Sequence, residues 1–224
     1  MIPWLKLDTA KVPGGDGEEL RLMQRGAEFS IMCGANELMN SRLSGSEEAL
    51  ARLTCERITG VAQPRLLIGG LGMGFTLRAA LAALGPGAQI VVAELVPAVV
   101  AWARGPMQPV FGDSLVDPRV TIEVGDVGAC IAAAPGGWDA ILLDVDNGPD
   151  GLTRAGNDAL YTAAGLRRAH AGLRPGGVLA VWSSGPDRAF SQRLAKAGFA
   201  VEETRVRATG RSGARHVIWL ATRR

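Results

Sequence analysis

Short apolar runs alternate with helical patterns from residue 64 to the end of the chain, and this alternation limits the fold more than any other feature. The runs cover 65–68, 89–95, 119–124, 138–145 and 176–183. Continuous apolar strands separated by helices are typical of a parallel sheet with helices on both faces. Two last runs, 199–208 and 214–222, are joined only by 209–213, which predicts a hairpin that places one antiparallel strand in the sheet. The expected fold is α/β, a Rossmann-like doubly wound sheet of about seven strands.

The first 60 residues follow a different pattern. Residues 19–41 contain short strand-like stretches broken by glycine-containing turns, which predicts a small antiparallel hairpin or meander. In SGSEEALARLTCERI (44–58), a serine precedes two glutamates and a helical apolar spacing, which predicts an N-capped amphipathic helix. We therefore expect a β-hairpin segment with a linking helix over 1–60, and a Rossmann-like domain over 61–224.

The first apolar run leads into a glycine-rich loop, Gly70-Leu71-Gly72-Met73-Gly74, and a predicted helix follows at once. Without Cβ atoms, glycines adopt positive φ values and let a ligand contact the backbone. Ligands of doubly wound sheets bind beyond the carboxyl ends of the strands, where the strand order reverses. The other interpretation is a purely structural turn, and the glycines alone leave both open.

Acidic residues follow the next three predicted strands. Glu94 ends the second strand, 20 residues beyond Gly74, at a place where a carboxylate can accept both hydroxyl protons of a ribose. Asp126 and Asp144 end the third and fourth strands. Each acid alone is equally well explained as a helix cap or a turn former. The four strand ends together predict a site for an adenosine-containing ligand.

The loop lacks the G-x-G-x-x-G spacing of a dinucleotide site. Its G-x-G-x-G spacing, the strand-end Glu94 and the later Asp126 resemble the S-adenosylmethionine site of Rossmann-like methyltransferases. A closer resemblance is to the spermidine synthase family of aminopropyltransferases, and it runs from about Glu19 to the C-terminus. It is carried by IGGLGMGFTLRAAL, VVAELVPAVVAWAR, DPRVTIEVGDV, WDAILLDVDNGPDG and ALYTAAGLRRAHAGLRPGGVLAVWS. The family has a small β-domain before the Rossmann-like domain.

The resemblance implies roles for individual residues. The implied cofactor-binding residues are Gly70, Gly72, Gly74, Glu94, Asp126 and Val127. Glu94 would bind the ribose, and Asp126 with Val127 would border the adenine. Asp144 would lie at the acceptor amine, and Tyr161, the only tyrosine, would lie near the active site. Asp144 and Tyr161 are thus candidate catalytic residues.

Three positions depart from the family's pattern. Gly72 stands where the family's loop has an Asp that holds the amine of the aminopropyl tail. Asn147 aligns with the family's second acid after the fourth strand, and an amide cannot act as a base. Ser46-Glu47 aligns with the family's Tyr-His pair.

Other carboxylates lie near the expected acceptor. Asp146, two residues beyond Asp144, would replace the missing second acid as a catalytic residue. Glu47, Asn147 and Trp182 are the expected substrate-binding residues. A mouth rich in carboxylates attracts a cationic amine and supplies a base. The alternative is an ordinary solvated acidic loop.

These observations lead to two enzyme hypotheses. The first, which we take as the main prediction, is methyl transfer from S-adenosylmethionine to a small amine-bearing acceptor, because a loop without its Asp has room for the carboxylate of methionine. The alternative is aminopropyl transfer from decarboxylated S-adenosylmethionine to a polyamine. Both need an in-line, unprotonated amine. A third hypothesis is a non-catalytic nucleoside-binding regulator.

Composition restricts the partners. Apolar residues make up 47% of the 224 residues, which is typical of a globular protein, and a net charge of +2 favours neither nucleic acid nor an anionic membrane. Dispersed cysteines, no signal-peptide pattern and no run of about 20 apolar residues predict a cytoplasmic protein. His170 and His216 lack partners at ligand spacing, so we expect both to be structural and no metal site. The family implies a possible homodimer.

Overall fold

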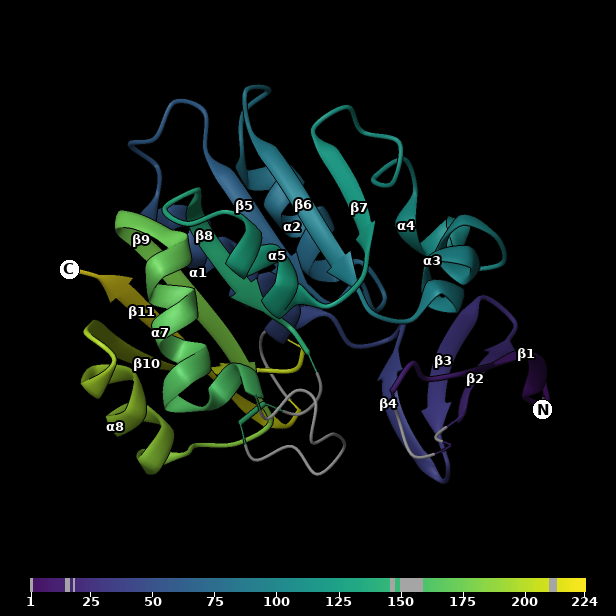
Figure 1. Cartoon of the computed structure of the whole chain (residues 1–224). Coiled ribbons are helices and arrows are strands. Elements are labelled where there is room, and N and C mark those ends of the chain that lie inside the picture. The colour runs from purple at the N-terminus through teal and green to yellow at the C-terminus, as the bar shows by residue number, and fades with distance from the viewer. Residues whose placement is uncertain (1, 15–16, 18, 146–147, 150–158, 210–212) are drawn as a thin grey trace.

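The structure is a computed structural model that describes residues 2–14, 17, 19–145, 148–149, 159–209 and 213–224. Two sheets organise the chain (Figure 1), one with four strands near the N-terminus and one with seven. The arrowheads of β6 and β7 in the large sheet point toward the small sheet (Figure 1). Within the described ranges, no helix is long and apolar enough to cross a membrane.

The small sheet is an antiparallel meander. Its strands are β1 (Leu5–Lys11), β2 (Glu19–Arg25), β3 (Glu28–Cys33) and β4 (Asn36–Asn40), in that order. Alternate residues of β2 and β3 point into the core, with Leu22 and Ile31 fully buried. The predicted meander is therefore present, and β1 adds an edge strand that the sequence did not indicate, since Leu5 and Leu7 of β1 remain exposed.

The large sheet confirms the predicted α/β fold. Its strands are β5 (Arg65–Gly69), β6 (Gln89–Glu94), β7 (Val120–Val124), β8 (Trp138–Leu143), β9 (Leu173–Ser183), β10 (Phe199–Arg207) and β11 (Arg215–Arg223). Their spatial order is β10-β11-β9-β8-β5-β6-β7. The last strand, β11, is antiparallel to both of its neighbours, and the other pairs are parallel, as the C-terminal hairpin predicts.

Helices cover both faces of the large sheet. They are α1 (Gly45–Arg57), α2 (Phe75–Ala83), α3 (Pro97–Arg104), α4 (Gln108–Phe111), α5 (Val127–Ala133), α7 (Ala163–Gly172) and α8 (Arg188–Lys196). Successive residues of β5 point to opposite faces, so Leu66 and Ile68 enter the core under α1 and α2, whereas Leu67 enters the core under α5 and α7. Each such buried side chain contributes roughly 1.5–3 kcal/mol. The first core also includes the small sheet.

The start of α1 differs in detail from the expected serine cap. Ser44 is the N-cap residue, but its side chain makes no capping hydrogen bond. The Ser46 hydroxyl instead donates to the Glu47 carboxylate at 2.6 Å and lies 2.9 Å from Nδ1 of His216. Glu47 and Glu48 in the first turn favour the helix through its dipole. Ser46, the serine directly before the two glutamates, therefore contacts His216 of the last strand instead of capping the helix.

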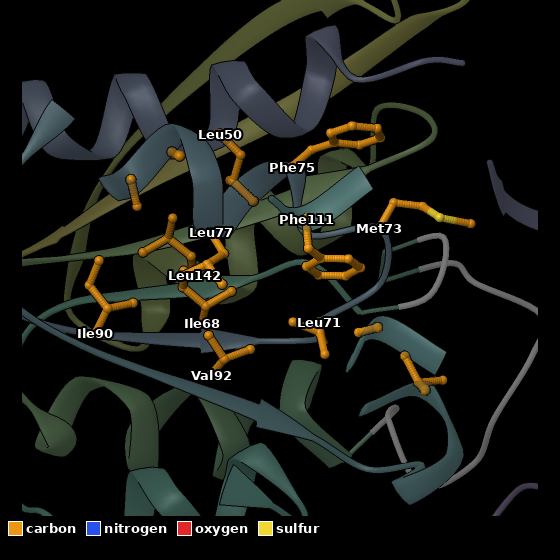
Figure 2. Close-up of a cluster of buried hydrophobic side chains, with 14 of the residues drawn as sticks. Leu50, Ile68, Leu71, Met73, Phe75, Leu77, Ile90, Val92, Phe111 and Leu142 are labelled. Atoms are coloured by element: carbon orange, nitrogen blue, oxygen red, sulfur yellow. The ribbon is translucent and has the colours of Figure 1, made fainter. Parts of the chain in front are cut away.

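The glycine loop owes its composition partly to contacts within the protein. Gly70 has a φ of 92°, and a Cβ there would lie 2.4 Å from the backbone oxygen of Asp144. Gly74 has a φ of 77°, and a Cβ there would lie 2.3 Å from the ring of Phe111. Figure 2 shows Phe111 in the same core as Leu71, Met73 and Phe75, the residues that flank the loop glycines. At these two positions the structural interpretation of the glycines is sufficient.

Replacing Gly74 with Ala is expected to destabilise the protein by roughly 2–4 kcal/mol, because the methyl group combines a positive φ with overpacking against Phe111. Urea unfolding followed by circular dichroism measures the change. Gly60→Ala is the matched control, since a Cβ at Gly60 meets no atom within 4 Å. Equal stability of the two variants would contradict the proposed packing constraint.

Candidate active site

The strand order reverses between β5 and β8, and the carboxyl ends of these strands form one edge. Three backbone hydrogen bonds connect the loops there. The Gly70 amide donates to Ala93, the Asp144 amide donates to Gly69, and the Gly125 amide donates to Glu94, all at 2.9–3.0 Å. The glycine loop, Glu94, Asp126 and Asp144 thus meet at the place where doubly wound sheets bind their ligands.

Glu94 is a buried carboxylate with backbone partners on two loops. One oxygen accepts from the Leu71 amide at 2.9 Å, and the other accepts from the Val96 amide at 2.8 Å. The side chain is only 8% exposed, so these bonds offset the cost of removing its charge from water. A carboxylate oxygen has two lone pairs, so a hydrogen bond from one amide does not by itself prevent it from binding a hydroxyl group.

A cavity of about 110 Å³ lies beside Glu94, between the edge of the large sheet and the small sheet. Its lining residues are Leu20, Cys33, Leu38, Met39, Gly70, Gly72, Ala93, Glu94, Leu95, Val96, Val99, Gly125, Asp126, Val127, Asp144 and Val145. Of the predicted cofactor-binding residues, all except Gly74 are among them. The cavity is smaller than the roughly 300 Å³ at which ligand pockets usually begin, so a nucleoside needs more room than this conformation offers.

Asp126 and Val127 line the cavity together with Asp144. Asp126 is the N-cap of α5, and one of its carboxylate oxygens accepts from the Ala129 amide at 2.9 Å. Val127 is buried and packs against Gly69, where a Cβ would lie 2.9 Å from a Val127 methyl carbon. The capping interpretation of Asp126 thus holds.

Gly72 faces the small sheet. A Cβ at Gly72 would lie 3.2 Å from the sulfur of Met39 on β4. The position where the family has a loop Asp is therefore covered by an apolar side chain. This contact was not predictable from the sequence, because Met39 is distant from Gly72 along the chain and belongs to the small sheet.

Asp144 is the most perturbed acid at this edge. Its carboxylate accepts from the Thr76 hydroxyl at 2.6 Å. Burial and the nearby Glu47 carboxylate raise the pKa of Asp144 to about 7, although the Thr76 bond acts in the opposite direction. A carboxyl group with a pKa near neutrality is suited to accept and release a proton at physiological pH. Thr76, on the first turn of α2, was not identified from the sequence.

Glu47 approaches Asp144 from α1. Its backbone oxygen is 3.4 Å from the Thr76 hydroxyl that bonds to Asp144. Burial raises the pKa of the Glu47 carboxyl. The structure therefore brings Glu47, predicted to bind substrate, near Asp144, although Glu47 is not among the residues that line the cavity.

Trp182 and Tyr161 are not among the residues that line the cavity. The Trp182 ring packs edge to face on His216 at 4.8 Å between centroids. Tyr161 is buried against Phe190, and its hydroxyl donates to the Val145 backbone oxygen at 3.3 Å. The catalytic role of Tyr161 and the substrate role of Trp182 stay predictions. The other two predicted residues, Asp146 and Asn147, lie outside the described residues.

The described part of the chain contains no group of three His, Cys, Asp or Glu side chains placed to hold a metal ion.

Solved spermidine synthases share this fold. The chain aligns with spermidine synthase from Thermotoga maritima with a TM-score of 0.77 and 16% identity, covering 98% of this chain and 73% of that one. The chain has the spermidine synthase fold. A spermidine synthase in complex with the transition-state analogue AdoDATO gives a TM-score of 0.76 at 16% identity, over 98% of this chain and 72% of the other.

The sequence also resembles curated aminopropyltransferases over part of its length. Polyamine aminopropyltransferases of Mycobacterium tuberculosis and Mycobacterium bovis are 34% identical over 101 residues, which is 44% of this chain. The matched segment spans only 18% of the length of those relatives. No protein-family model matches the chain. The spermidine synthase-like resemblance predicted from the sequence is thus confirmed.

The main functional prediction, methyl transfer, is wrong by the same findings. The similar proteins are spermidine synthases and polyamine aminopropyltransferases, which favours the aminopropyl alternative. Methyl transfer was predicted because Gly72, with no side chain, would leave room for the carboxylate of methionine. Because the Met39 sulfur lies against Gly72, the absence of a side chain at that position does not create the assumed space.

The raised pKa of Asp144 predicts a pH-dependent stability. Its folded pKa of about 7 exceeds the ordinary value of 3.8, so the folded protein binds more protons between these values. The stabilising contribution is present below pH 4 and is lost as the pH rises through 7. We expect Asp144→Asn to become more stable relative to the wild type over this window, by up to about 4 kcal/mol.

Urea unfolding at pH 4.5 to 8 for both proteins measures this difference, with the window set by the pKa of Asp144. The exposed Asp113→Asn is the matched control for the loss of one carboxylate. A wild-type minus Asp144→Asn difference that does not change with pH would refute the shifted pKa.

Proposed function

We propose that the protein is an aminopropyltransferase that uses decarboxylated S-adenosylmethionine and a diamine or polyamine. The observation that carries the proposal is the meeting of Glu94, the glycine loop and Asp144 at one edge of a spermidine synthase fold. The curated relatives named for polyamine aminopropyl transfer support the reaction type.

Glu94 and the loop amides would hold the nucleoside of the donor. The Glu94 carboxylate already spans the Leu71 and Val96 amides, so its orientation is fixed before a ligand binds. Such preorganisation lowers the entropic cost of binding. Asp126 and Val127 also line the cavity, and we expect the adenine beside them.

Asp144 would prepare the acceptor amine. A primary amine is an ammonium ion in neutral water and must lose a proton before its lone pair can attack. Asp144, with a pKa of about 7, can take that proton and later release it to solvent. The sulfonium donor supplies the leaving group, because the electron pair of the breaking C–S bond returns to a neutral thioether sulfur. The amine gives up one proton before it attacks, and its nitrogen keeps the other protons when the N–C bond forms. One proton is therefore passed to the protein per turnover.

The expected substrate preference follows from Met39. Its thioether covers Gly72, and an apolar neighbour is unfavourable for the carboxylate of intact S-adenosylmethionine. Cytoplasmic location and a homodimer stay predictions from the sequence.

The first test is calorimetric titration with the decarboxylated and the intact nucleoside, followed by turnover assays with a panel of diamines and polyamines. We expect at least tenfold tighter binding of the decarboxylated form and release of the thioether nucleoside with a diamine. Tighter binding of the intact form, or no turnover with any amine, would refute the proposal. Binding of the decarboxylated form with no turnover would instead favour the non-catalytic nucleoside-binding hypothesis.

The second test is Asp144→Asn. An amide cannot accept the amine proton, so turnover is expected to fall by about 10²–10⁴-fold. Donor binding is expected to change less than threefold, since the Glu94 contacts are on other loops. The exposed Asp113→Asn serves as control with unchanged turnover. Full activity of Asp144→Asn would exclude it as the base.

A further inference from the structure

Behind Glu47 lies a chain of hydrogen bonds that reaches the last strand. The Ser46 hydroxyl donates to Oε2 of Glu47 at 2.6 Å, and Nδ1 of His216 lies 2.9 Å from the same hydroxyl oxygen. Ser46 is 1% exposed, so water does not compete for these bonds. The three side chains come from α1 and β11, whose residues are about 170 positions apart.

A hydroxyl in this position can connect its neighbours in both protonation states. When Glu47 is ionised, Ser46 donates to it and accepts the N–H of His216. When Glu47 carries a proton, it can donate to Ser46, and Ser46 can donate to Nδ1 of His216. The reversal needs only rotation of one hydroxyl and a change of imidazole tautomer, with no movement of the backbone.

The surroundings bring the proton affinities of Glu47 and His216 closer together. Burial raises the pKa of the Glu47 carboxyl, and the neighbouring Glu48 adds to the rise while the Ser46 bond opposes it. Burial lowers the pKa of His216, which packs edge to face against Trp182. A proton moves most readily between groups of similar affinity.

Within the described residues, few charged groups act on the hydrogen-bonded series of Glu47, Ser46 and His216. Glu48 on α1 acts on Glu47, and Glu47 acts on Asp144 after β8. Thr76 on α2 is neutral and links the two acids, through the Asp144 carboxylate at 2.6 Å and the Glu47 backbone oxygen at 3.4 Å. Burial, rather than a neighbouring charge, is the cause of the His216 shift.

We propose that Glu47 is a second proton acceptor for the substrate amine, and that Ser46 and His216 carry this proton away from the site. This inference rests on the proposed function, since it concerns the amine of that reaction. The amine gives its proton to Glu47, Glu47 gives a proton to Ser46 as Ser46 gives its own to Nδ1 of His216, and the imidazole releases one proton to solvent. No bond to carbon and no redox step is involved, so the protons balance within the chain.

The inference assigns His216 a role that its position in the sequence did not indicate. Glu47 would also replace the family's second acid, which is Asn147 in this sequence, although Glu47 is distant from Asn147 along the chain. Ser46 and His216 are positioning residues here, because they act on the amine only through Glu47.

The first experiment follows the imidazole protons of the ligand-free protein by NMR as the pH is varied. The chain has 2 histidines, so His170 serves as an internal reference. We expect Glu47→Gln and Ser46→Ala each to shift the His216 titration by at least half a pH unit and to leave that of His170 unchanged. A His216 titration that is the same in all three proteins would overturn the inference.

The second experiment measures the pH profile of turnover. Ser46→Ala and His216→Gln are expected to lower kcat about 10-fold and to remove one ionisation from the profile, whereas Ser46→Thr, which keeps the hydroxyl, restores most of the rate. His170→Gln is the matched control, since His170 packs on Phe199 away from the site. Wild-type kinetics in both Ser46→Ala and His216→Gln would overturn the inference.

The two tests separate this inference from the proposed function. Turnover of an amine by the wild-type protein tests the reaction itself. The NMR coupling of His216 to Glu47 is measured without substrate, and the difference between variants tests the proton path alone.

Discussion

The carboxylate of Glu94 is the interaction on which the geometry of the site depends. It joins the loop after β5 to the segment before α3 through the Leu71 and Val96 amides. Each of these amides is at the end of a parallel strand, where the sheet itself supplies no partner. A buried charge of this kind is costly unless it is well bonded, so the loops are held in one arrangement. The position of Asp144 follows, because its amide bonds to Gly69 directly before the glycine loop.

Most of the fold could be predicted because burial on both faces gives strands an unmistakable apolar run. Leu66, Leu67 and Ile68 enter two different cores, so no polar residue interrupts β5. The edge strand β1 could not be found in this way, since it has no continuous apolar run and its two leucines, Leu5 and Leu7, are exposed.

The site was predictable to the extent that it lies at the ends of parallel strands. Glu94, Asp126 and Asp144 meet there because neighbouring parallel strands end at one edge. The contact of Ser46 with His216 was not predictable, because it exists only where β11 inserts antiparallel beside β9 and meets α1. The error over methyl transfer has a similar origin. The lack of a side chain at Gly72 suggested room for a ligand, but the side chain of Met39 from the small sheet lies there.

The cavity between the two sheets has a thermodynamic consequence. Leu20, Cys33, Leu38 and Met39 form its small-sheet wall, and the volume of about 110 Å³ is less than a nucleoside needs. The small sheet is joined to the large domain in part by one bond from Trp102 to Asp8, at 2.7 Å. A ligand bound in this cavity would contact both sheets, so the packing of the small sheet on the large one and the affinity for the ligand are thermodynamically linked. Substitutions at the interface between the two sheets are therefore expected to change the affinity for the ligand, even where they lie far from any reacting atom.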